Sequence, residues 1–196
     1  MKFKFQVALV ALLIVGLGAM HSFAQTSKPA EKSGDKKKVE GPKAPDFELK
    51  DLDGKKTYKL SDYKDKIVVL EWTEPGCPYV ERHYNSKNMQ TLAKKWGDEV
   101  VWLSIWSGSK KPDSAMKEFM KRHGVEHVIL RDKDGSVGKS YKARTTPHMY
   151  VINQGVKIYE GAIDDDKYGK KGGTVGLAIA HATVGQILWD RSCAKR

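Results

Sequence analysis

The sequence lacks long apolar runs and a concentrated basic patch, and each absence excludes a class of protein. Past residue 24 no stretch is apolar enough to cross a bilayer, so no stable membrane span is expected there. The 196 residues carry a net charge of +11, but the lysines are spread along the chain and mixed with acidic residues. No basic stripe interleaved with aromatic residues is present, which favours a basic surface over a nucleic-acid-binding site. No nucleic-acid partner is therefore expected.

Cysteine is almost absent, because the chain holds only Cys77 and Cys193. In an oxidising compartment the two could pair, and a bridge that closes so long a loop contributes roughly 4–5 kcal/mol in the chain-entropy model. The sequence by itself leaves open whether the two sulfurs meet.

The N-terminus is typical of a secretory signal peptide over residues 1–24. Two lysines give it a positive start, an apolar run follows over 7–19, and Ser22 and Ala24 are the small residues that a signal peptidase reads. We therefore expect cleavage after Ala24 and a secreted or periplasmic mature protein. The alternative is an uncleaved membrane anchor, which the short apolar run disfavours.

Composition divides the rest of the chain into three parts. Residues 25–43 are rich in Lys, Ser, Pro, Gly and Glu and have almost no apolar side chains, which predicts a flexible linker. Residues 44–190 contain the apolar runs that can form a core, and residues 191–196 are a short C-terminal tail. We therefore expect one domain of ordinary size.

The apolar patterns within this domain predict an α/β architecture. Alternation around an Asp53-Gly54 turn indicates an N-terminal β-hairpin, and continuous apolar runs indicate buried central strands. The predicted helices cover 79–96, 112–122 and 174–189, and the predicted strands after the hairpin cover 67–70, 100–106, 128–130, 149–152 and 156–159. Their order predicts a central mixed β-sheet flanked by helices.

The segment after the first buried strand carries the most chemistry. It delivers Cys77 to the start of a predicted helix, with Pro78 directly after it. Unpaired amide groups and the helix dipole favour negative charge at such a start, and the thiolate is the nucleophilic form of cysteine. The position therefore suits attack on a disulfide or a peroxide. The alternative is a buried structural cysteine.

Short motifs along the domain give it a resemblance to a known family. The motifs are Ala44-Pro45-Asp46-Phe47, Glu71-Trp72-Thr73, Cys77-Pro78-Tyr79-Val80, Thr145-Thr146-Pro147-His148-Met149 and Gly161-Ala162-Ile163-Asp164-Asp165. Over about residues 44–165 the chain resembles the thioredoxin superfamily, and specifically its exported redoxin branch related to alkyl hydroperoxide reductase and thiol-specific antioxidant (AhpC/TSA) proteins. The resemblance implies a thioredoxin-like fold and an exported thiol-dependent oxidoreductase or peroxidase.

The resemblance also implies roles for single residues. Cys77 is then the attacking cysteine of a Cys-x-x-Cys motif, and Pro147 is a cis-proline that faces it. Thr146 presents its backbone to an extended substrate, and Pro78 and His148 complete the substrate-binding residues. From the residues alone, Pro147 is an ordinary trans proline, and His148 either tunes the thiol or is an exposed strand residue. The implied partners are a disulfide or peroxide substrate and an external thiol reductant, and no cofactor is expected.

Glu71 lies six residues before Cys77, where thioredoxins keep a buried acid. A buried carboxyl group has a raised pKa and can move protons near neutral pH, so the resemblance implies a catalytic role for Glu71. The alternative is a glutamate at the end of a strand that faces solvent or pairs with a lysine.

The chain departs from the family's motifs at two positions. Val80 occupies the place of the second cysteine of the motif, so a local disulfide is impossible. A peroxidase would carry Thr or Ser three residues before the cysteine, where this chain has Glu74, with Thr73 one place further away. Arg82 and Arg144 are candidates for an arginine that holds the thiolate, although neither lies in a matching motif.

Cys193 is the candidate for the missing second thiol. It either resolves an intermediate on Cys77 and is then catalytic, or it is an incidental cysteine of the tail. A metal site is not expected, because the histidines are scattered and Glu81 stands near the place of the second cysteine of copper-delivery relatives. Besides such a copper-delivery protein, the alternative function is a non-catalytic thioredoxin-fold module that binds peptides.

Overall fold

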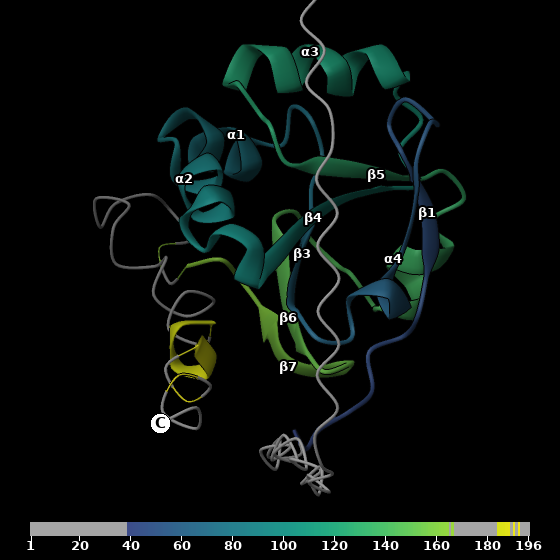
Figure 1. Cartoon of the computed structure of the whole chain (residues 1–196). Coiled ribbons are helices and arrows are strands. Elements are labelled where there is room, and N and C mark those ends of the chain that lie inside the picture. The colour runs from purple at the N-terminus through teal and green to yellow at the C-terminus, as the bar shows by residue number, and fades with distance from the viewer. Residues whose placement is uncertain (1–38, 165, 167–183, 189, 191, 193–196) are drawn as a thin grey trace, which may run out of the picture. The chain divides into compact units, whose positions relative to one another are not determined.

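The computed structural model describes residues 39–164, 166, 184–188, 190 and 192. In this part of the chain, seven strands form one sheet in the order β2-β1-β5-β4-β3-β6-β7 (Figure 1). The strands are β1 (Glu48–Asp51), β2 (Thr57–Lys59), β3 (Ile67–Trp72), β4 (Val100–Ser107), β5 (Val128–Asp132), β6 (His148–Asn153) and β7 (Val156–Gly161). The helices are α1 (Pro78–Asn85), α2 (Asn88–Lys95), α3 (Asp113–His123) and α4 (Ser136–Ser140), with 3-10 turns η1 (Leu60–Tyr63) and η2 (Gly97–Glu99).

The middle of the sheet is parallel and its edges are antiparallel. β4 pairs in parallel with β3 and with β5, and helices α1, α2 and α3 lie in the crossovers that parallel neighbours require. β6 and β7 form an antiparallel hairpin beside β3, and the hairpin of β1 and β2 extends the sheet beside β5. The predicted mixed sheet with an N-terminal hairpin is confirmed.

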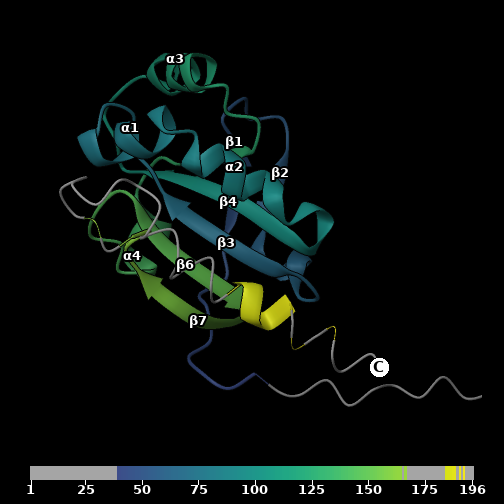
Figure 2. The ribbon, with the colours of Figure 1, turned by 90° about the vertical axis from the view of Figure 1, so that its left-hand side faces the viewer.

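Side chains of β3 alternate between the two faces of the sheet, and each face has its own core. Ile67 and Val69 belong to a core that they share with α1, α2 and α3. Val68 and Leu70 belong to a second core, shared with α4 and the N-terminal hairpin. Figures 1 and 2 accordingly show α1, α2 and α3 together on one side of the strands. Because of this alternation, Glu71 lies on the side of α1, α2 and α3.

The predicted helix over 79–96 is wrong in one respect, because the structure has two helices there. α1 ends at Asn85, and Lys87 has a left-handed backbone with φ of 60° before α2 begins at Asn88. The polar residues at this break are not buried, so the apolar spacing continues on both sides of it. Helical periodicity therefore did not reveal the break.

Other sequence signals are confirmed where the structure describes them. α3 follows Pro112 and ends at Gly124, whose φ of 64° makes it a left-handed cap. Most of the predicted helix over 174–189 lies outside the described residues. The part that is described, residues 184–188, is helical. In the described ranges, no helix has the length and apolar character to cross a membrane.

Candidate active site

β3, a short loop and α1 together place Cys77. β3 ends at Trp72, and Cys77 is the N-cap residue of α1, with Pro78 at the first helical position. A missing amide hydrogen costs little at that position, since the first turn of a helix has no intrahelical acceptor for it. The loop turns through Gly76, whose φ of 82° favours glycine, and the backbone N–H of Cys77 donates to the carbonyl of Glu74 at 3.1 Å. Cys77 is half-buried at the start of the helix, as the sequence predicts.

The thiol meets a second segment that comes from the far side of the sequence. Cys77 Sγ donates a hydrogen bond to the carbonyl oxygen of Thr146 at 3.2 Å, and the Thr146–Pro147 peptide bond is cis. β6 begins directly afterwards, and its antiparallel register sets His148 opposite Trp72 of β3. The predicted cis bond and its position beside Cys77 are confirmed.

The carboxylate of Glu74 anchors the loop before Cys77. Its oxygens accept hydrogen bonds from Trp106 Nε1 at 2.7 Å and Ser109 Oγ at 3.1 Å, and Lys111 Nζ lies 2.9 Å away. Lys111 also donates to the carbonyl of Pro75. The position where a peroxidase motif has a hydroxyl is thus filled by a carboxylate that is fully engaged in holding the loop.

Glu81 ties the same loop to α3. Its Oε1 accepts from the backbone N–H of Gly76 at 3.2 Å and from Arg122 Nη2 at 2.7 Å, and its Oε2 is 2.8 Å from His123 Nε2. The contacts of this carboxylate therefore hold the loop before Cys77 against α3. Across the described ranges, no group of three His, Cys, Asp or Glu side chains is arranged to hold a metal ion.

Glu71 is buried completely and surrounded by donors. Ser104 Oγ donates to its Oε2 at 2.7 Å, Trp102 Nε1 donates to the same oxygen at 3.1 Å, and the Tyr84 hydroxyl lies 2.9 and 3.0 Å from the two carboxyl oxygens. Burial raises the pKa of Glu71, and these hydrogen bonds act in the opposite direction. The predicted buried acid is confirmed, and the alternative of a solvent-facing glutamate is wrong. Cys77 is not among the hydrogen-bond partners found for Glu71 in the described residues.

His127 extends this buried group towards solvent. Its Nε2 is 3.0 Å from Ser104 Oγ, 3.2 Å from the Tyr84 hydroxyl and 3.9 Å from Glu71 Oε2. Burial lowers the pKa of His127 to about 4. The side chain also lines a cavity of about 250 Å³, whose other lining residues are Gln90, Ala93, Lys94 and Glu126.

Sequence reasoning missed the residues around Glu71. Ser104 could have been found, because parallel pairing of the two buried strands sets it opposite Glu71. Tyr84 follows Cys77 by two helical turns, so it lies on the same face of α1. His127 precedes β5 and carries no local signal of its contact with Glu71, which depends on how β5 packs beside β4.

The other predicted residues have mixed positions. His148 is 8 % exposed, so the alternative of an exposed strand residue is wrong, and its Nδ1 lies 3.1 Å from the Tyr150 hydroxyl. Arg82 pairs with Asp164 at 3.3 Å instead of holding the thiol. Pro78 and Arg144 are exposed.

Several expectations fall on residues outside the described part of the chain. These are the signal peptide over 1–24, most of the linker, and Cys193 in the tail, and they stay predictions. Val80 stands at the place of the motif's second cysteine. It is a residue of α1 whose side chain is fully buried in the core. It therefore leaves no second thiol at this turn of the helix.

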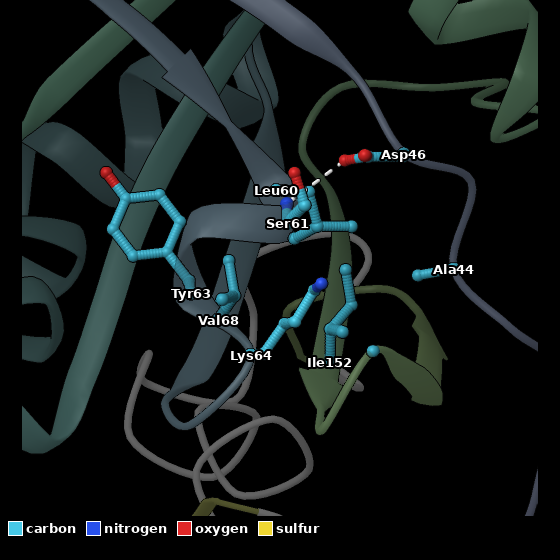
Figure 3. A pocket seen from close by; sticks show the side chains of 9 residues that line it. Ala44, Asp46, Leu60, Ser61, Tyr63, Lys64, Val68 and Ile152 are labelled. Atoms are coloured by element: carbon cyan, nitrogen blue, oxygen red, sulfur yellow. Dashed lines mark hydrogen bonds between the residues drawn. The ribbon is translucent and has the colours of Figure 1, made fainter.

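A second cavity, of about 170 Å³, lies away from Cys77 (Figure 3). Its lining includes Val68 and Ile152, which pair across β3 and β6 near the start of β3. Cys77 follows the opposite end of that strand. In the cavity, Asp46 accepts a hydrogen bond from the backbone N–H of Ser61 at 3.0 Å. This cavity is therefore not part of the Cys77 site.

Comparisons with known proteins agree with this geometry. The model of the AhpC/TSA family matches residues 41–160. The chain is 30% identical over 129 residues to the thiol-disulfide oxidoreductase ResA of Bacillus subtilis, covering 61% of this chain and 64% of that protein. It is 28% identical over 127 residues to the thioredoxin-like protein YneN of the same organism, covering 64% of this chain and 69% of the relative.

Solved structures share the fold. A hypothetical protein of Sinorhizobium meliloti superposes with a TM-score of 0.64 at 23% identity, over 73% of this chain and 81% of that one. A putative thiol:disulfide interchange protein DsbE of Chlorobium tepidum superposes with a TM-score of 0.55 at 24% identity, over 76% of this chain and 96% of that one. The fold is thus thioredoxin-like.

Proposed function

The chain belongs to the AhpC/TSA family, and we propose that it is a thiol–disulfide oxidoreductase whose reacting atom is the sulfur of Cys77. The observation that carries the proposal is the position of this thiol. It caps the start of α1 and contacts the carbonyl of Thr146 beside the cis bond to Pro147. The relatives named as thiol-disulfide oxidoreductases add support to the same reaction class.

The reaction begins when Cys77 loses its proton. Its thiolate attacks one sulfur of a substrate disulfide, a bond forms between the two sulfurs, and the substrate S–S bond breaks. The second substrate sulfur leaves as a thiolate and takes up a proton. The product is a mixed disulfide on Cys77 and a free thiol, so two electrons have moved to the departing sulfur.

Thr146 helps in this step through its backbone. Its carbonyl accepts the hydrogen bond of the thiol at 3.2 Å. A thiolate cannot donate, so ionisation of Cys77 releases this carbonyl to accept a backbone N–H of an extended substrate. Pro147, exposed Pro78 and His148 then surround the bound segment as substrate-binding residues.

Glu71 is proposed as the proton store of the reaction. Its raised pKa lets it hold a proton at a pH where an exposed glutamate is ionised. In the described residues no hydrogen bond joins Glu71 to Cys77, so we propose that water carries the proton between them.

The substrate class is a disulfide, with a peroxide as the competing possibility. Peroxide chemistry of the redoxin type needs a hydroxyl and an arginine beside the thiolate. Here Glu74 is tied to Trp106 and Ser109, and Arg82 is paired with Asp164. These contacts favour disulfide exchange.

A second thiol must complete the cycle, because Val80 provides none. The sulfur of an external thiol attacks the substrate sulfur of the mixed disulfide, and the Cys77 thiolate leaves. The external thiol and the substrate sulfur are then joined in a new disulfide. Cys193 performs this step only if its Cα comes within roughly 7 Å of the Cα of Cys77. Residues 1–24 support export of the protein to a compartment where its substrates are disulfides.

Turnover of a disulfide and of hydrogen peroxide, measured side by side with an external thiol, tests the proposal. We expect disulfide reduction by the wild-type chain and complete loss of turnover in Cys77→Ser. Cys193→Ser removes a thiol by the same substitution but keeps Cys77, so it tests whether Cys193 resolves the intermediate. If Cys193 resolves the intermediate, this variant stalls as a mixed adduct that mass spectrometry detects, and otherwise it turns over normally.

Three results would contradict the proposal in different ways. Full activity in Cys77→Ser would remove Cys77 from the reaction. Turnover of peroxide but not of disulfide would replace the substrate class. Binding of extended peptides without any turnover would indicate a non-catalytic peptide-binding module.

A further inference from the structure

A carboxyl group sealed inside a protein exchanges its proton only through the groups that contact it. The indole N–H of Trp102 donates to Glu71 but cannot accept, so it cannot pass a proton on. The hydroxyls of Ser104 and Tyr84 can do both. Each also lies within hydrogen-bond distance of His127 Nε2, at 3.0 Å for Ser104 and 3.2 Å for Tyr84.

His127 connects this buried group to a space that can hold water. Its Nε2 faces the two hydroxyls, while its side chain is 8 % exposed and lines the cavity of about 250 Å³. Water in the liquid occupies about 30 Å³ per molecule, so the cavity has room for several molecules. The cavity is also large enough for a small planar molecule such as imidazole.

The charges around His127 suit a proton relay. Burial lowers its pKa to about 4, so the imidazole is neutral near pH 7, with one nitrogen that accepts and one that donates. Burial also holds the pKa of Tyr84 well above its usual range, so its hydroxyl keeps its proton. At the cavity, Lys94 from α2 and Glu126 pair with each other at 2.8 Å.

We propose that His127 exchanges the proton of Glu71 with water in this cavity, through the hydroxyl of Ser104. When Glu71 is protonated, the Ser104 hydroxyl turns to accept from the carboxyl and to donate to His127 Nε2. In the release step, the proton of the Glu71 carboxyl moves to Ser104 Oγ while the proton of Ser104 moves to His127 Nε2. The proton on Nδ1 then passes to water, which leaves the imidazole neutral, and the reverse sequence returns a proton to Glu71. His127 therefore acts on the reaction only through the proton of Glu71.

The use of this route rests on the proposed function. A bound disulfide substrate covers Cys77 and excludes water from that side of Glu71. The cavity lies between α2 and the segment before β5, so Glu71 can take up or release a proton there while the substrate is bound.

Hydrogen–deuterium exchange of the Glu71 carboxyl in the full chain, with Cys77 alkylated so that its side of Glu71 is covered, tests the relay. The infrared C=O band of the protonated acid is identified by its loss in Glu71→Gln, and its shift is followed after transfer into D₂O. We expect His127→Ala to slow this exchange about tenfold or more, and added imidazole to restore it. Lys94→Met changes the cavity lining without touching the relay and should exchange at the wild-type rate.

A role in packing predicts different results. Benzene fills the same space but carries no proton, so rescue by benzene as well as by imidazole would overturn the relay. Wild-type exchange in His127→Ala, or the absence of a protonated band for Glu71 at every pH, would overturn it too. If His127→Ala does not fold, His127→Gln keeps a polar side chain and should show the same slow exchange.

Failure of the proposed function gives a separate result. A wild-type chain that reduces no disulfide would contradict the proposed function. The exchange rate of Glu71 would still decide the relay, because that measurement needs no turnover.

Discussion

Replacement of His127 by glutamine should change how the stability of the protein depends on pH. Burial lowers the pKa of His127 to about 4 from 6.5, and the side chain is only 8 % exposed. Between these two pH values, His127 carries up to about one more proton in the unfolded chain than in the native chain. Because each pH unit of this window contributes 1.36 kcal/mol, the effect amounts to about 3 kcal/mol.

The sign follows from the lowered pKa. Above about pH 6.5 the imidazole is neutral in both states, and the full native stability is present. As the pH falls from about 6.5 to about 4, the unfolded state gains a proton that the native state resists, so the free energy of unfolding decreases. Glutamine does not titrate, so this decrease is absent from the variant. Glu71, whose raised pKa acts in the opposite direction, is present in both proteins.

Urea unfolding followed by tryptophan fluorescence and circular dichroism measures the effect. Free energies of unfolding of the wild type and of His127→Gln are compared at several pH values between about 4 and about 7.5. We expect the wild type to lose about 3 kcal/mol relative to the variant across this window, and Lys94→Gln to follow the wild type. A difference between wild type and His127→Gln that stays constant across the window would refute the reasoning.

Two further predictions concern the core and the N-terminus. A Cβ at Gly138 would lie 3.0 Å from Ser107 Oγ, which is held between Trp72 Nε1 at 2.9 Å and Asp132 at 2.6 Å. Gly138→Ala should therefore destabilise the protein by about 1–3 kcal/mol in urea unfolding, and an unchanged midpoint would contradict this. The signal-like residues 1–24 predict that the exported protein begins at Gln25, and intact Met1 in that fraction by mass spectrometry would contradict export with cleavage.

Much of the fold could be predicted from the sequence, because its signals are local. Continuous apolar runs indicated β3 and β4, and Pro112 with Gly124 marked the start and end of α3. The break between α1 and α2 could not be predicted in this way. Its polar residues sit on the exposed side, so the apolar spacing does not change there.

The sequence by itself was sufficient to identify the residues that we propose as the reacting site of this protein. Cys77 follows a buried strand and precedes a helix, and Thr146-Pro147 precedes an apolar strand, so short motifs were sufficient to predict both. The sequence also shows that Val80 occupies the place of the second cysteine of the motif. Only the tertiary structure decided what surrounds Glu71, because that depends on contacts between distant segments. Parallel pairing of β3 with β4 brings Ser104 to the carboxyl, and the packing of β5 beside β4 brings His127 to Ser104.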